Sequence, residues 1–108
     1  MEAIRRGDIW TVALPTFAKP RPALVVSIDP INDLRPDILV APITTRAGPL
    51  RVPLPDAAAT TGLRETSFLK CETVGPIHKS RLKARIGRLP ATAWPDVEAG
   101  LCLVLGIR

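Results

Sequence analysis

The sequence is poor in residues that many catalytic and metal sites require, because it has no tyrosine, one histidine and two cysteines. With His78 as the single histidine, a mechanism with two histidines as acid and base is excluded, and so is a histidine-rich metal centre. Cys71 and Cys102 are far apart and form no C-x-x-C motif, so we expect two buried thiols rather than a metal site or a disulfide. The sequence therefore predicts no metal and no cofactor.

Long apolar runs are also absent. The opening residues MEAIRRGDIW contain no signal-peptide run, and the late run LCLVLGI is far shorter than the ~20 residues of a membrane span. We therefore expect a cytoplasmic protein without membrane association.

Several motifs of common enzymes are missing as well. The chain has no Walker-type glycine-rich loop and no G-x-S-x-G motif. Pro30 and Pro36 interrupt a segment of evenly spaced acids and are expected to prevent a helix there. No carboxylate metal cluster is therefore predicted from Asp29, Asp33 and Asp37. An enzyme of this composition must work with arginine, hydroxyl groups and a preformed electrostatic site.

Short apolar segments separated by prolines make up most of the chain. With 108 residues, 46% of them hydrophobic, we expect a single domain over residues 1–108. Twelve prolines argue against a helical bundle, and Pro42 and Pro53 inside strand candidates suggest sheet edges or bulges. The strand candidates are residues 7–14, 22–28, 38–43, 50–54, 67–71, 73–77 and 83–89. In the first of these, Trp10, Val12 and Leu14 should share one face. The pattern predicts a mainly β fold, a small barrel or sandwich of about six or seven short strands.

The C-terminal segment has a different periodicity. From Thr92 onward, apolar residues recur with a period near 3.6, which predicts an amphipathic helix that docks on the strands. Pro95 is tolerated only in a first turn, so the helix should begin within about four residues before it. The apolar positions are Trp94, Val97, Leu101, Val104 and Leu105.

The positive charge is concentrated in one region. Residues 64–88 contain seven Lys or Arg and two Glu, which accounts for the whole net charge of +5. The cations Lys79, Arg81, Lys83 and Arg85 alternate with small or apolar residues. If this segment is extended, all four cations lie on one face and form a surface suited to a phosphate backbone. The alternative is an ordinary solvated strand face.

Arg21 occupies an unusual position in the stretch KPRPALVVS. Prolines precede and follow it, so its backbone is restricted to extended conformations just before an apolar strand. Such rigidity is unnecessary for a cation that serves solubility alone.

Several segments occur together in a recognisable order: RRGDIWTVAL, KPRPALVVS, ILVAPITT, RVPL, KCETVGPIHKSRL, RIGRL and a helix ending in LVLGI. In this order they resemble the MazF/PemK-like toxins from Arg6 to Ile107. The resemblance implies a small SH3-like barrel with a C-terminal helix, and a homodimer. It also implies a toxin that cleaves single-stranded RNA without metal, by attack of the ribose 2′-OH on the adjacent phosphate. The implied partner is a cognate antitoxin with an acidic, disordered C-terminal segment.

The resemblance also implies roles for individual residues. The family's catalytic arginine falls on Arg21, and its catalytic hydroxyl falls on Thr44 in APITT. Arginine can present two parallel N–H donors to the developing phosphorane and threonine can add a third, whereas a guanidinium stays protonated and is a poor base. The alternative for Arg21 is a turn anchor, and for Thr44 it is a hydroxyl that caps its own backbone. The substrate-binding candidates are Lys19, Thr45, Arg46, Lys70, Glu72, Thr73, Lys79 and Arg81.

The chain departs from the family in two places. The first loop, PTFAK, is short, and the residues at Thr73, Gly75 and His78 differ from those common in relatives. Since base contacts come from this second region, the recognised RNA sequence does not transfer. Two alternative functions stay open: a non-catalytic toxin on the same barrel that inhibits a protein such as DNA gyrase, and a basic RNA-binding barrel without chemistry.

Overall fold

Residues 2–108 are described by a computed structural model, which contains seven strands and three α-helices. Three single 3₁₀ turns lie between them, at Cys71–Thr73, Lys79–Arg81 and Ala91–Ala93. The elements are β1 (Asp8–Val12), β2 (Arg21–Val25), α1 (Asp29–Leu34), β3 (Asp37–Thr44), β4 (Arg51–Pro53), α2 (Ala58–Thr61), β5 (Phe68–Lys70), β6 (Gly75–His78), β7 (Leu82–Arg88) and α3 (Trp94–Leu105).

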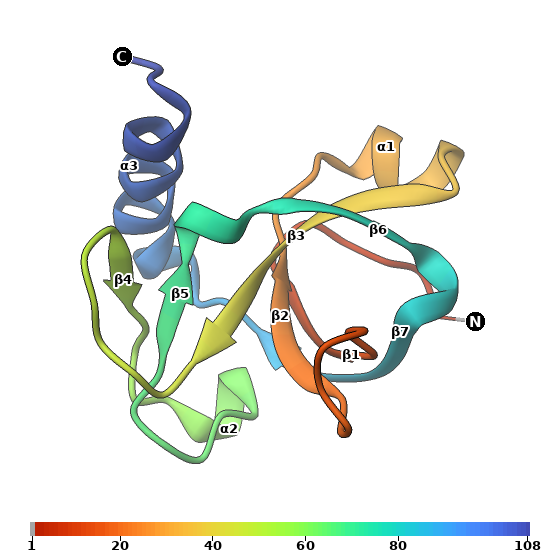
Figure 1. Ribbon diagram of the computed structural model, residues 1–108, viewed down its shortest axis with the longest axis horizontal. Helices are drawn as coiled ribbons and strands as arrows, with labels where there is room; N and C mark the ends of the chain where they lie inside the picture. Colours follow the sequence, from red (N-terminus) through yellow and green to blue (C-terminus); the bar gives the residue numbers. More distant parts are fainter. Residues whose placement is uncertain (1) are drawn as a thin grey trace.

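The strands form one antiparallel sheet in the order β4-β5-β3-β2-β1-β7, with β6 also paired to β3. In Figure 1 the sheet curves strongly, so that β3, β2, β1, β7 and β6 surround a common interior, while β4 and β5 lie beside α3. The mainly β class, the seven strands and the C-terminal helix agree with the sequence-based expectation. Because β4 and β7 are its two ends, the sheet is open rather than fully closed.

Pro42 and Pro53, the two prolines predicted to mark edges or bulges, lie where a missing donor is tolerated. On one side, β3 pairs with β6 over Asp37–Val40 and then with β5 at Ile43 and Thr44. Pro42 lies at the change of partner, so it has no paired residue on that side. Pro53 belongs to β4, an edge strand of the sheet. Both positions agree with the predicted edges or irregularities.

The sheet buries side chains on both faces. Ile9 pairs with Leu24, and both belong to the core between the sheet and α3, together with Val97 of that helix. The next pair, Trp10 and Ala23, faces the other core, inside the curve of the sheet. This second core also contains Val12, with Leu14 packed against it, as the alternation in the sequence predicted.

Helix α3 begins and ends as its sequence indicates. It is preceded by the 3₁₀ turn at Ala91–Ala93, and Pro95 lies in its first turn, where no N–H donor is needed. Gly106 adopts a left-handed conformation after the last turn, and Ile107 N–H donates to the Cys102 carbonyl at 2.8 Å. No helix within residues 2–108 has the length and apolar character needed to cross a membrane. Cys71 is buried and Cys102 half-buried, and both are free thiols.

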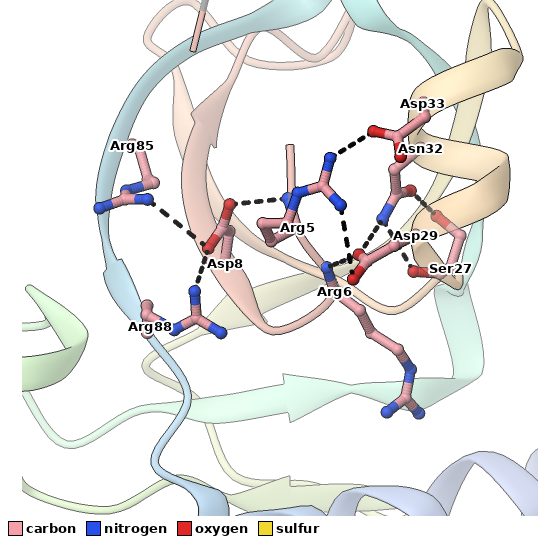
Figure 2. A network of polar contacts seen from close by, with 9 residues as sticks. All are labelled: Arg5, Arg6, Asp8, Ser27, Asp29, Asn32, Asp33, Arg85 and Arg88. Atoms are coloured by element: carbon pink, nitrogen blue, oxygen red, sulfur yellow. Dashed lines mark hydrogen bonds and ion pairs between the residues drawn. The ribbon is translucent and has the colours of Figure 1, made fainter. Parts of the chain in front are cut away.

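A polar network connects the N-terminal segment to α1 and β7 (Figure 2). The buried carboxylate of Asp8 accepts from Arg5 N–H at 2.8 Å and from Arg88 Nη1 at 3.3 Å, and Arg85 Nη1 lies 3.9 Å away. On the other side, Asp29 accepts from Arg6 N–H at 2.7 Å. The remaining members of the network are Ser27, Asn32 and Asp33.

The helix α1 corrects one expectation from the sequence. Pro30 and Pro36 were expected to prevent a helix, but Pro30 lies in the first turn, where its missing N–H is harmless, and Pro36 follows the helix end. Asp29 and Asp33 therefore share α1 and both form ion pairs with Arg5. Hydrogen bonding from Arg6 N–H is the main reason why the pKa of Asp29 falls below its usual 3.8; partial desolvation opposes it.

The predicted basic stripe is not one extended face, which is a second correction. Lys79–Arg81 is a 3₁₀ turn, stabilised by His78 Nδ1, which accepts from Ser80 N–H at 3.1 Å. Within β7 the register against β1 shifts between Ala84 and Leu82, so Lys83 lies in a bulge without a paired residue. The four cations consequently do not follow the alternation of one regular strand.

Candidate functional site

An open cleft of about 670 Å³ lies where β2 begins and β3 ends. Its walls come from the loop after β1, the loop after β3 and the segment 62–67 after α2. The lining residues that bear on its chemistry are Phe17, Arg21, Thr44, Thr45, Arg46, Arg51, Arg64, Glu65 and Lys70. The cleft is therefore bordered by backbone from several separate parts of the chain.

Arg21 and Thr44 are brought together by the pairing of β2 with β3. The register pairs Ala23 with Pro42, and continuing it by two residues along each strand places Arg21 opposite Thr44. Arg21 is also held from the other side, where it pairs with Val12 of β1. Both residues line the cleft. Two side chains that are distant in sequence thus border one cavity on fixed strand ends.

The Thr44 hydroxyl has a local partner. Its oxygen accepts a hydrogen bond from Arg46 N–H at 3.2 Å, which closes the turn after β3. A hydroxyl that accepts in this way keeps its own proton for donation. The backbone-capping role considered from the sequence is therefore present, and it leaves the hydroxyl proton available for a ligand in the cleft.

Arg51 organises the loop that follows β3. Its Nη1 donates to the Arg46 carbonyl at 2.9 Å, and its Nε donates to Glu72 at 3.1 Å. Desolvation raises the pKa of Glu72, but hydrogen bonds from its own backbone N–H and from Arg51 outweigh it and lower the pKa below 4.5. Glu72 therefore stays ionised and neutralises Arg51, so Arg51 has a structural partner.

The other cations of the cleft are not neutralised. Arg21, Arg46, Arg64 and Lys70 form no ion pair with any residue from 2 to 108, and Glu65 is the one carboxylate among the described residues that line the cleft. The site therefore has an excess of positive charge facing solvent, as an anionic ligand requires. Between residues 2 and 108 there is also no group of three His, Cys, Asp or Glu placed to hold a metal ion.

The structure separates the predicted site residues into two sets. Those that line the cleft are Arg21, Thr44, Thr45, Arg46 and Lys70. Those that lie outside its lining are Lys19, Glu72, Thr73, Lys79 and Arg81. In the second set, Glu72 binds Arg51, Thr73 donates to the Lys70 carbonyl at 3.3 Å, and Arg81 Nη1 contacts the Ala13 carbonyl at 3.4 Å.

Four of these lining residues, Phe17, Arg51, Arg64 and Glu65, were not predicted from the sequence. Arg64 reaches the cleft because α2 packs closely on β7: a Cβ at Gly62 would lie 2.2 Å from the Ile86 carbonyl oxygen, and one at Gly87 would lie 2.3 Å from Thr61. Gly62 also has a left-handed φ of 73°, which ends α2 and turns the chain toward the cleft. In the sequence, Gly62 directly after Thr60 and Thr61 was the available signal for this turn.

Comparisons with known proteins place the whole chain in one family. A family model described as "PemK-like, MazF-like toxin of type II toxin-antitoxin system" matches residues 5–105. The endoribonuclease MazF6 of Mycobacterium tuberculosis is 35% identical over 114 aligned residues, which cover 96% of this chain and 98% of that protein.

Solved structures of similar proteins have the same fold as this chain. The Mycobacterium tuberculosis toxin MazF-mt6 superposes with a TM-score of 0.80 at 25% identity, over 94% of this chain and 98% of that one. An endoribonuclease in complex with its cognate antitoxin, from a mycobacterial species, superposes with a TM-score of 0.83 over 100% of this chain and 98% of that one. At 20% identity, this second likeness shows the fold alone.

Proposed function

This chain belongs to the family of PemK-like and MazF-like toxins of type II toxin-antitoxin systems, and on that premise we propose that it is a metal-independent endoribonuclease for single-stranded RNA. The observation that carries the proposal is the position of Arg21 and Thr44 on adjacent strand ends at the cationic cleft. A phosphodiester is the anion that such a cleft suits, and the two side chains supply the donors that its cleavage requires.

The proposed reaction is an internal transfer at phosphorus. The ribose 2′-oxygen forms a bond to the adjacent phosphorus and loses its proton, and the bond from phosphorus to the 5′-oxygen of the next nucleotide breaks. That oxygen takes up a proton, so the products end in a cyclic 2′,3′-phosphate and a 5′-hydroxyl. Negative charge accumulates on the non-bridging oxygens, where Arg21 donates through two N–H groups and Thr44 through its hydroxyl.

The other lining residues hold the RNA strand. Arg46 and Lys70 supply charge for phosphates on either side of the reacting one, and Thr45 supplies a hydroxyl. Arg64, from the segment after α2, joins this set. Because Arg51 is already paired with Glu72, we assign it to shaping the loop rather than to binding RNA.

The proposal includes the partners of the toxin. An acidic antitoxin segment is complementary to a cleft with four unpaired cations, so the antitoxin would compete with RNA for the same surface. The proposal also includes a homodimer, which the family resemblance implies, and a cytoplasmic location, where cellular RNA is available as substrate.

A cleavage assay in excess EDTA tests the proposal. Purified protein is incubated with a long single-stranded RNA, and the cut ends are mapped for their 2′,3′-cyclic phosphate. We expect discrete cuts that EDTA does not suppress. RNA that binds but stays intact would identify a binding barrel without chemistry, and RNA that neither binds nor breaks would point to a protein target such as DNA gyrase.

A further inference from the structure

Phe17 is the one aromatic residue, among those the structure describes, that lines the cleft. Its side chain lies in the loop between β1 and β2, and Phe17 N–H donates to the Leu14 carbonyl at 3.1 Å, which fixes the turn. The other aromatic side chains have different surroundings: Trp10 is buried in the inner core, Arg6 covers Trp94 at 3.8 Å, and Phe68 is half-buried on β5. Phe17 is thus the ring placed to meet a ligand.

Phe17 combines exposure with a contact to Arg21. Its exposed fraction is 48%, and the Arg21 Cζ atom lies 4.9 Å from the ring centroid. A guanidinium at this distance over a ring face is a cation–π contact. Arg21 covers one face of the ring, and about half of the residue's surface is still exposed to water. The ring therefore retains surface for a second planar group. An apolar ring in this position adds nothing to either core.

We propose that Phe17 stacks on a nucleobase of the RNA substrate, so that base, ring and Arg21 guanidinium form one stack at the entrance to the cleft. This inference rests on the proposed function, because it assumes RNA as the ligand. Single-stranded RNA offers unpaired bases, and stacking on aromatic side chains is the contact that tolerates any base. Since the stack includes Arg21, a bound base also fixes its phosphate relative to the donors that act on it.

Two roles of Phe17 predict different kinetics. If the ring only holds Arg21 in position, its loss lowers kcat and leaves RNA affinity unchanged. If it stacks on a base, its loss weakens RNA binding, including binding by a protein that does not cleave. The tests therefore measure binding separately from cleavage.

Binding is measured in the Thr44→Ala background, by fluorescence anisotropy of a labelled single-stranded RNA. Adding Phe17→Leu removes the ring and keeps apolar bulk, and we expect the Kd to rise about fivefold to a hundredfold, the range for loss of one base–aromatic stack. Phe17→Tyr should bind within about twofold of the parent, because it keeps the π-face. Leu103→Ala is the matched control, since Leu103 is an exposed apolar residue on α3 outside the cleft lining.

Spectroscopy gives an independent measurement. In Phe17→Trp, also in the Thr44→Ala background, bound RNA should quench the new indole fluorescence beyond the change seen in the Thr44→Ala parent, which reports Trp10 and Trp94. An unchanged Kd in Phe17→Leu together with no added quenching would overturn the proposal, and a fall in kcat alone would leave Phe17 as a positioning residue for Arg21. Wild-type cleavage in EDTA is run in parallel, so failure of the nuclease proposal is recognised separately from failure of stacking.

Discussion

The molecule has two groups of arginines that look alike in sequence and differ in their surroundings. In the network of Figure 2, the guanidinium groups of three arginines lie near carboxylates: Arg5 pairs with Asp29 and Asp33, and Arg88 and Arg85 approach the buried Asp8. Three aspartates balance the charge of these three arginines, and the side chains connect β1, α1 and β7.

In the cleft, three arginines and one lysine have no carboxylate partner among residues 2–108, whereas Arg51 is paired with Glu72. The unpaired cations are Arg21, Arg46, Arg64 and Lys70. An ion pair within the fold satisfies an arginine, whereas an arginine in an open cleft keeps its donors for a ligand. We therefore base the proposed RNA site on cations that are unpaired among residues 2–108 and also line the cleft, rather than on the number of cations in a segment.

The largest predicted effect is on catalysis in the cleft. Thr44→Ala removes one donor to the developing phosphorane and should lower kcat about a hundredfold to a thousandfold, measured under saturating RNA in EDTA. The unfolding free energy should change little, because Thr44 is only half-buried. Thr44→Ser keeps the hydroxyl and should retain most of the rate. Equal rates for Thr44→Ala and wild type would remove Thr44 from the site.

A smaller effect, on stability, is predicted in the network. Asp8→Ala leaves the Arg5 N–H without an acceptor and removes the partner of Arg88, so the unfolding free energy should fall by about 1–3 kcal/mol in urea titrations. The exposed loop residue Asp56 is the control, and Asp56→Ala should stay within about 0.5 kcal/mol. If Asp8→Ala were as stable as wild type, the network would not hold the fold.

The salt dependence of RNA binding compares cations inside and outside the cleft. Each phosphate contact on a single strand contributes about 0.7 to the slope of log Kd against log salt concentration. Arg46→Gln and Lys70→Gln should each reduce the slope by about that amount, whereas Lys79→Gln, outside the lining, should leave it nearly unchanged. A larger reduction for Lys79→Gln would restore the basic segment 79–85 as the main RNA contact.

The smallest predicted effect concerns pH. The pKa of Asp29 is lowered in the folded protein, so its stabilising contribution is present above its usual pKa of 3.8 and is lost as the pH falls through the folded pKa. Asp29→Asn should therefore reduce stability at pH 7 more than below pH 3. Urea titrations of both proteins at the two pH values measure this difference, and a constant difference would contradict it.

Much of the fold follows from local patterns in the sequence. Alternation of apolar residues identified β1, which contains Trp10 and Val12. The 3.6 period, with Pro95 in the first turn, identified α3. In each case the pattern reflects one face buried in a core. Arg21 and Thr44 came from the resemblance to the family, and the pairing of Ala23 with Pro42 explains how they meet.

Other parts depend on contacts between distant residues, which local patterns do not encode. The alternating cations did not form one strand face, because His78 caps a 3₁₀ turn and Lys83 lies in a bulge against β1. Arg64 faces the cleft because Gly62 and Gly87 let α2 approach β7. The proposed role of Phe17 depends on the contact between its ring and the Arg21 guanidinium, which the sequence alone does not indicate.

One variant from each group of arginines tests the difference between the two groups most directly. Arg21→Ala and Arg88→Ala are each assayed for RNA cleavage in EDTA and for unfolding in urea. We expect Arg21→Ala to lose about a hundredfold to a thousandfold in cleavage rate with unchanged stability. Arg88→Ala should cleave like wild type and lose up to about 1 kcal/mol of stability, since its side chain is half-exposed. Cleavage that survives in Arg21→Ala, or that is lost in Arg88→Ala at full stability, would contradict the assignment of catalysis to the unpaired arginine.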